Sequence, residues 1–144
     1  MANTFHVSLN VESIPEAVTR YRKILGAEPA KVRPDYAKFE LADPPLILSL
    51  NLGGTPGTVG HLGIRYPEQS SVAAELRRAE ADALEPFRQD GVTCCYAKAD
   101  KFWVRDADGM PWEMYTLLED AEAETAADQS LRSFLEQDRS IPAA

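Results

Sequence analysis

The segment His6-Val7-Ser8-Leu9-Asn10-Val11 (HVSLNV) returns 55 residues later as HLGIRY, residues 61–66. Both segments alternate apolar and polar residues with a period of two, which is typical of a β-strand with one buried face. In each segment the histidine shares a face with the small residue and the polar residue that follow it. The repeat therefore predicts that His6 and His61 occupy equivalent positions in two copies of one structural unit.

A helix and three short strands are predicted after each of these strands. In the first copy, Ser13 is a suitable N-cap with Glu16 three residues on, and Gly26 is a suitable C-terminal stop. The capping signals at the ends of the helix are weaker in the second copy. The predicted helices span residues 14–25 and 70–83, and the predicted strands span residues 30–33, 36–41, 46–50, 93–97, 101–105 and 111–117.

The spacing of the repeat changes along the chain. Lys38-Phe39 matches Lys101-Phe102 at an offset of 63, so about eight residues have been added to the second copy, and we place them within residues 81–91. We predict an α+β fold in which paired βαβββ modules, residues 4–52 and 59–117, form a cupped mixed sheet. The two modules make a single domain, residues 1–118, and residues 119–144 form an acidic tail that is partly helical.

The composition excludes several classes of partner. The chain has 144 residues and a formal net charge of −8, so phosphate backbones and anionic lipids are repelled and neither nucleic acid nor a membrane is an expected partner. The first residues, MANTFHVSLNV, lack the basic start and apolar run of a secretory signal, so we expect a cytoplasmic protein. Cys94 and Cys95 are adjacent and cannot close a loop, which makes local chemistry their expected role.

Three side chains are candidate metal ligands. His6 and His61 are the two histidines of the chain, and both lie on the polar face of equivalent strands. A single strand histidine is usually a hydrogen-bonded structural residue, but two at equivalent positions favour a ligand pair. Glu113 is a carboxylate in an aromatic-rich strand, where a metal would offset its desolvation. The alternative for Glu113 is a charge that discourages edge-to-edge aggregation.

The candidate ligands are unequally divided between the two copies. At the offset of 63, the counterpart of Glu113 is Leu50, which cannot bind a metal, so a symmetric four-ligand site is not expected. Two imidazoles and one carboxylate leave several coordination positions open, which indicates catalysis and suits Fe(II) and oxygen chemistry. Zn, Ni, Co and Mn bind similar ligand sets, so the residues leave the identity of the metal open.

Cys94 and Cys95 form a soft ligand pair. Neighbouring thiolates suit soft centres such as trivalent arsenic, Cd or Hg, and the positive charge of Lys101 and of a metal would favour the thiolate form. Successive strand residues point to opposite faces, so we predict a mobile loop that lets both sulfurs reach one ligand. The alternatives are two buried, apolar-like residues or a vicinal disulfide.

These features together resemble a known superfamily. The paired modules, the first-strand histidines and the segment DADGMPWE, residues 106–113, are similar to the vicinal oxygen chelate superfamily, which includes glyoxalase I, extradiol dioxygenases and bleomycin resistance proteins. The segments DYAKF (35–39), TCCYA (93–97) and DKFWV (100–104) resemble more specifically the ArsI group of carbon-arsenic bond lyases, a group that includes cadmium-induced proteins of the CadI type.

The resemblance implies a reaction and a role for each candidate residue. It implies that Fe(II) bound by His6, His61 and Glu113 activates O2, while Cys94 and Cys95 bind a trivalent organoarsenical. The expected substrates are methylarsonite and aromatic arsenicals, and the expected product is arsenite. Two alternatives stay open: a glyoxalase-like lyase or isomerase that uses a metal as a Lewis acid, and a protein that sequesters cadmium or arsenicals without turnover. Members of the superfamily commonly associate as pairs of chains, which leaves homodimer formation open.

Overall fold

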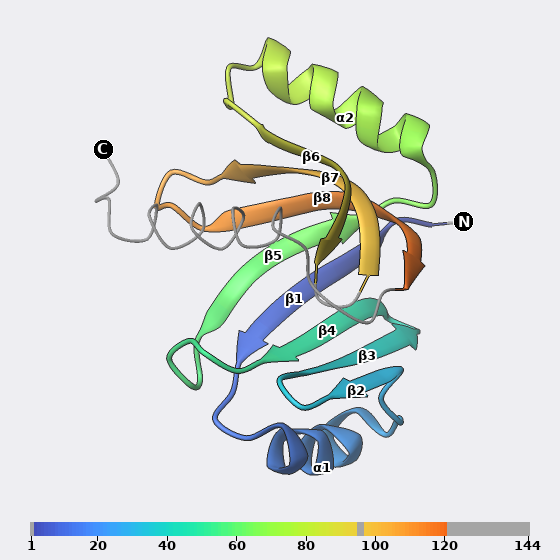
Figure 1. Cartoon of the computed structure of the whole chain (residues 1–144), viewed down its shortest axis with the longest axis vertical. Coiled ribbons are helices and arrows are strands. Elements are labelled where there is room, and N and C mark those ends of the chain that lie inside the picture. The colour runs from blue at the N-terminus through green and yellow to red at the C-terminus, as the bar shows by residue number, and fades with distance from the viewer. Residues whose placement is uncertain (1, 95–96, 121–144) are drawn as a thin grey trace. The chain divides into compact units, whose positions relative to one another are not determined.

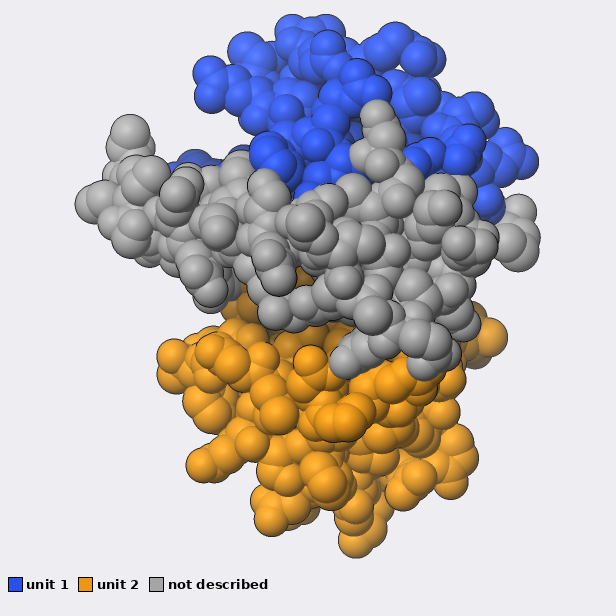
Figure 2. All heavy atoms as spheres, in the orientation of Figure 1, with its two compact units in different colours: residues 1–3, 63–144 blue, residues 4–62 orange. Residues whose placement is uncertain are grey.

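The computed structural model describes residues 2–94 and 97–120, and the side chains of all of these except residues 90–94, 97–99 and 118–120. The chain comprises two compact units, shown in different colours in Figure 2. The N-terminal unit contains residues 4–62, and the C-terminal unit contains residues 1–3 and 63–144. In the described part of the chain, both helices are too short to cross a membrane.

The N-terminal unit follows the predicted strand, helix and three-strand order (Figure 1). Its strands lie in the order β2-β3-β4-β1, where β1 pairs in parallel with β4 and the other neighbours are antiparallel. The elements are β1 (Thr4–Asn10), α1 (Ile14–Leu25), β2 (Lys31–Arg33), β3 (Tyr36–Ala42) and β4 (Pro45–Asn51).

Local sequence signals set both ends of α1. The Ser13 side chain accepts a hydrogen bond from the Glu16 backbone N–H, and Gly26 ends the helix in the left-handed conformation at a φ of 64°. The buried face of α1 packs on the sheet to form the core of this unit. The buried core residues are Ile14, Val18, Ala37, Phe39, Leu48 and Leu50.

The C-terminal unit repeats this arrangement. The strand β5 crosses the boundary between the units, because residues 59–62 belong to the N-terminal unit and residues 63–65 to the C-terminal unit. The strands of the C-terminal unit lie in the order β5-β8-β7-β6, and Val72 and Ala79 of its helix pack with Tyr66, Phe102 and Val104. The elements are β5 (Val59–Arg65), α2 (Gln69–Ala81), β6 (Phe87–Cys94), β7 (Ala97–Arg105) and β8 (Pro111–Asp120).

The predicted fold class is confirmed. Each half is a βαβββ module, and the strand order β2-β3-β4-β1-β5-β8-β7-β6 is that of a mixed sheet. One strand prediction is wrong, because the strand expected at residues 93–97 is β6, which begins at Phe87 and ends at Cys94. The expected helical tail, residues 119–144, lies outside the described residues from residue 121 onward.

The strand registers correct the position of the added residues. Lys31 pairs with Lys38 on the β2–β3 hairpin, and Gln89 pairs with Lys101 on the β6–β7 hairpin. The offset between the repeats is therefore 58 at Gln89, against 55 at the histidines and 63 at Lys101. Only three of the eight added residues precede β6, so placing all of them within residues 81–91 is wrong. The other five extend the hairpin that carries Cys94 and Cys95.

Candidate metal centre

His6 is buried on β1 and lies beside β4. Its Nε2 atom is 3.0 Å from Ser49 Oγ. Ser49 is two residues beyond Ile47, the direct partner of His6 in the parallel pairing of β1 with β4. A metal held through Nδ1 of His6 would leave the bond to Ser49 in place, whereas a metal held through Nε2 would replace it. In either case β4 fixes the plane of this imidazole before a metal arrives.

His61 lies close to His6 within the N-terminal unit. The two ring centroids are 5.4 Å apart with an angle of 65° between the planes, and one ring nitrogen of each residue lies within 4.8 Å of the other. Two nitrogens on one ion, each about 2.1 Å from it, are at most about 4.2 Å apart. The Nε2 atom of His61 is buried. The structure thus brings the two predicted histidine ligands to nearly the separation that a shared metal requires.

A polar network supports the histidine pair from β4. The Asn51 side-chain amide donates to Ser8 Oγ at 2.6 Å and lies 3.5 Å from Ser49 Oγ. Ser8, Ser49 and His6 are all buried, so this chain of hydrogen bonds satisfies polar groups that water does not reach. The sequence analysis missed Ser49 and Asn51. Their alternation with the core residues Leu48 and Leu50 is the period-two signal that could have revealed them.

Glu113 is buried on β8 in the C-terminal unit, at 5% exposure. Its Oε2 atom accepts a hydrogen bond from Lys101 Nζ at 2.6 Å, and both side chains of this ion pair are almost fully buried. The pairing of Lys101 with Tyr115, and of Trp103 with Glu113, places all four residues on one face of the β7–β8 ladder. Within this unit the Lys101 ammonium offsets the desolvation of Glu113, and the predicted role of Glu113 as a metal ligand stays a prediction.

The Lys101 side chain is enclosed by aromatic rings. Its Nζ atom lies 5.9 Å from the centroid of Trp103 and 5.8 Å from that of Tyr115, within the range of a cation–π contact. The indole N–H of Trp103 donates to Gln89 Oε1 at 3.2 Å. These contacts hold the ammonium on the Glu113 carboxylate. A role for Lys101 at the thiols stays a prediction.

Gly63 brings β5 close to Glu113. A Cβ atom at Gly63 would lie 2.6 Å from the backbone oxygen of Glu113 and 3.2 Å from its Cβ. The first distance is too short for a van der Waals contact, so a residue with a Cβ atom would force the two strands to shift. His61 lies two residues earlier on the same strand. The glycine therefore permits the close packing of β8 on the strand that carries the second histidine.

The predicted thiol pair lies at the end of β6. The backbone of Cys94 pairs with Ala97 as the last residue of the strand, while Cys95 and Tyr96 lie outside the described residues. The predicted loop at Cys94-Cys95 falls partly outside the described residues, and the positions of both sulfurs stay a prediction.

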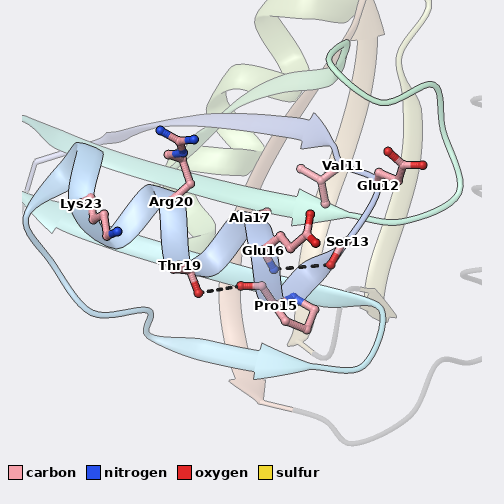
Figure 3. A pocket seen from close by; sticks show the side chains of 9 residues that line it. All are labelled: Val11, Glu12, Ser13, Pro15, Glu16, Ala17, Thr19, Arg20 and Lys23. Atoms are coloured by element: carbon pink, nitrogen blue, oxygen red, sulfur yellow. Dashed lines mark hydrogen bonds between the residues drawn. The ribbon is translucent and has the colours of Figure 1, made fainter.

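A cavity of about 700 Å³ lies elsewhere, at the N-terminal end of α1 (Figure 3). It is lined by Ser13, Pro15 and Thr19, where the Thr19 hydroxyl donates to the Pro15 carbonyl, together with charged side chains such as Glu12 and Lys23. None of the predicted metal or thiol residues lines this cavity. It is separate from the candidate centre.

Comparison with known proteins shows the family. The model of the Glyoxalase/Bleomycin resistance protein/Dioxygenase superfamily matches residues 4–114. The chain belongs to this superfamily. Among relatives, the "Cadmium-induced protein CadI" of Mycobacterium tuberculosis is 43% identical over 117 residues, covering 81% of this chain and 77% of the relative. A "Trivalent organoarsenical cleaving enzyme" of Bacillus sp. strain MD1 is 44% identical over 113 residues, covering 76% and 70%. Another of that name, from Thermomonospora curvata, is 38% identical over 126 residues, covering 86% and 83%.

Solved structures of the superfamily share the fold of this chain. Homoprotocatechuate 2,3-dioxygenase from Arthrobacter globiformis matches with a TM-score of 0.62 at 17% identity, covering 90% of this chain and 39% of the dioxygenase. The Mn(II)-bound glyoxalase from Novosphingobium aromaticivorans matches with a TM-score of 0.60 at 16% identity, covering 84% and 41%. At these identities the likeness shows the architecture alone.

Proposed function

We propose that this superfamily member is an Fe(II)- and O2-dependent enzyme that cleaves the carbon-arsenic bond of trivalent organoarsenicals and releases arsenite. The observation that carries the proposal is the identity of 36–44% to three proteins named as trivalent organoarsenical cleaving enzymes or probable ones. The CadI relatives, at 43% sequence identity, are named for induction by cadmium, which like trivalent arsenic is a soft centre that prefers thiolate ligands.

The metal in this proposal is bound by His6, His61 and Glu113. The donor set fits a divalent ion with open positions, since two neutral imidazoles and one carboxylate are the ligands of non-haem Fe(II) oxygenases. The support is the separation of the two imidazoles in the N-terminal unit and the buried, oriented carboxylate in the C-terminal unit. When bound, Fe(II) supplies a centre at which O2 and substrate can meet; Ni, Co, Zn or Mn could occupy it in purified protein.

The substrate in this proposal is bound through arsenic by Cys94 and Cys95. Both cysteines fall, in sequence, between Gln89 and Lys101, which are five residues further apart than their counterparts Lys31 and Lys38 in the first module. Two thiolates on one arsenic would fix the organic substituent in one position, which converts a random encounter into an oriented reaction. The hairpin extension is therefore where we place the recognition of the substrate.

The proposed reaction balances for a methylated substrate without an added reductant. One CH3As(OH)2 and one O2 give one As(OH)3 and one HCHO, in which the methyl carbon loses four electrons and O2 gains them while arsenic stays trivalent. The protein contributes the positions of the ligands and of the thiols, and the buried faces of β1, β4 and β8 exclude bulk water from those ligands. Methylarsonite is therefore the substrate with which to test the proposal first.

The experiment is a turnover assay of Fe(II)-loaded protein with methylarsonite, with and without O2. We expect arsenite and formaldehyde in equal amounts, and O2 consumed one for one, in the aerobic sample only. Arsenite formed equally well without O2 would contradict the oxygenase mechanism and favour a metal-dependent lyase of another class. Saturable binding of one arsenical per chain, with no arsenite in either sample, would identify a sequestering protein instead.

A further inference from the structure

We infer that Lys101 is a positioning residue that restricts Glu113 to binding the metal through a single carboxylate oxygen, and so keeps one further coordination position open. This inference rests on the proposed metal site of His6, His61 and Glu113. It concerns how the carboxylate binds, rather than whether it does.

Lys101 and Glu113 form a short, buried ion pair. Lys101 Nζ is 2.6 Å from Oε2 of Glu113, and the two side chains are 3% and 6% exposed. A short, buried, charge-assisted hydrogen bond to one oxygen makes that oxygen a poor second donor to a cation. The other oxygen, Oε1, is the one left for the metal. Two imidazole nitrogens and one carboxylate oxygen then occupy three positions.

The Lys101 ammonium cannot easily move away from the Glu113 carboxylate. Its ammonium lies 5.9 Å from the ring centroid of Trp103 and 5.8 Å from that of Tyr115, and the Trp103 indole N–H donates a hydrogen bond to Gln89. Trp103 is 1% exposed, so the enclosure has no adjacent solvent into which the ammonium could swing. The pairing with Glu113 is thus built into the β6–β7–β8 ladder.

Electrostatic repulsion determines whether Lys101 strengthens or weakens metal binding. An ammonium hydrogen-bonded to a ligand carboxylate lies within several ångströms of the bound cation, where two like charges repel strongly in a buried environment. Lys101 therefore weakens metal binding while it preserves an open position. Replacing it with a neutral side chain should do the reverse, giving tighter metal binding and fewer sites for added ligands.

The test compares wild-type protein, Lys101→Met and Lys38→Met, each titrated with Co(II) under anaerobic conditions. Lys38 is the matched control, because it occupies the position of Lys101 in the first module, is also buried, and lies 3.6 Å from Glu40, which is outside the proposed ligand set. The visible spectrum of Co(II) reports coordination, and azide added to the Co(II) protein reports open positions.

We expect Lys101→Met to bind Co(II) at least about tenfold more tightly than wild type, to change the Co(II) spectrum, and to bind azide more weakly. Lys38→Met should match wild type in all three. Unchanged or weaker Co(II) binding by folded Lys101→Met, or an unchanged azide affinity, would overturn the inference. Failure of wild type to bind Co(II) would instead contradict the proposed metal site.

If Lys101→Met does not fold, infrared difference spectra of wild type decide the question. The separation of the two carboxylate stretching bands distinguishes one-oxygen from two-oxygen binding, and ¹³C-labelled glutamate with Glu113→Gln as the reference assigns them. A wide separation on metal addition is expected. A narrow separation, as for chelation by both oxygens, would overturn the inference.

Discussion

His6 and Ile47 lie directly opposite each other where β1 pairs in parallel with β4. The β3–β4 and β7–β8 registers align Ile47 with Glu113 at an offset of 66, because Lys38 pairs with Ser49 and its equivalent Lys101 pairs with Tyr115. The pairing with the histidine strands aligns Ser49 with Glu113 instead, at an offset of 64, because the Val11 N–H donates to the Asn51 carbonyl and the equivalent Tyr66 N–H donates to the Tyr115 carbonyl. Choosing Leu50 as the counterpart at an offset of 63 is therefore wrong. Neither Ile47 nor Ser49 carries a carboxylate, an imidazole or a thiol, which agrees with three predicted ligands rather than four.

Ile47→Glu tests the proposed ligand arrangement by supplying a second carboxylate directly opposite His6. Ile47 is 1% exposed, so the metal-free variant should lose at least about 2 kcal/mol of stability through burial of a charge. Added Zn(II) should raise its Tm by more than it raises that of wild type, because the new carboxylate becomes a fourth ligand. Thermal unfolding with and without Zn(II) measures both effects, and an equal rise of Tm in the two proteins would show that a carboxylate at position 47 does not reach the metal.

Leu50→Glu is the matched control, at the residue that the offset of 63 aligns with Glu113. Leu50 is fully buried in the core beneath α1, on the opposite face of β4 from Ser49. A charge there has no partner and should cost more than about 4 kcal/mol, with no recovery on Zn(II) addition. Circular dichroism of the purified variant checks this, and a folded variant rescued by Zn(II) would show that the register assignment is wrong.

Gly63→Ala tests the close approach of β5 to β8. The added methyl group would meet the Glu113 backbone oxygen at 2.6 Å, so the strands must separate, at a cost of about 1–3 kcal/mol. Gly60→Ala, on the same strand, is the control because its Cβ meets nothing closer than 3.4 Å. Denaturant unfolding should show a loss for Gly63→Ala alone, and equal stability of the two variants would remove the steric argument.

The fold could be predicted from sequence wherever a local signal was unambiguous. Ser13 and Gly26 gave the bounds of α1 correctly, because capping is a short-range effect. The start of β6 was missed because its register shifts between Gln89 and Val92, and a bulge leaves no reliable trace in hydrophobic alternation. The same added residues displaced the repeat alignment and led to Leu50.

The candidate site was only partly accessible to sequence reasoning. The equal phase of His6 and His61 follows from period-two alternation alone, and the structure places the two rings together. The ion pair of Lys101 with Glu113 joins residues 12 apart through the β7–β8 register, which is set by the turn between the strands rather than by either side chain. Sequence spacing could not show that a lysine compensates the charge of the buried carboxylate.

Replacement of Cys94 or Cys95 by alanine tests the proposed substrate site. Each single variant should bind phenylarsine oxide about 100-fold more weakly or worse, because the second thiol of a pair adds its affinity through a high effective concentration. Co(II) binding should be unchanged. Isothermal titration of both ligands into each variant measures this, and a single variant that keeps wild-type affinity for the arsenical would exclude that cysteine from the site.

The proposed function requires that His6, His61 and Glu113 bind one metal ion. Anomalous diffraction from crystals of Fe(II)-loaded protein, collected at the iron absorption edge under anaerobic conditions, tests it most directly. We expect one anomalous peak at about 2.0–2.2 Å from a ring nitrogen of each histidine and from one oxygen of Glu113. A peak on any other set of residues, or no peak in protein that retains stoichiometric iron, would contradict the account.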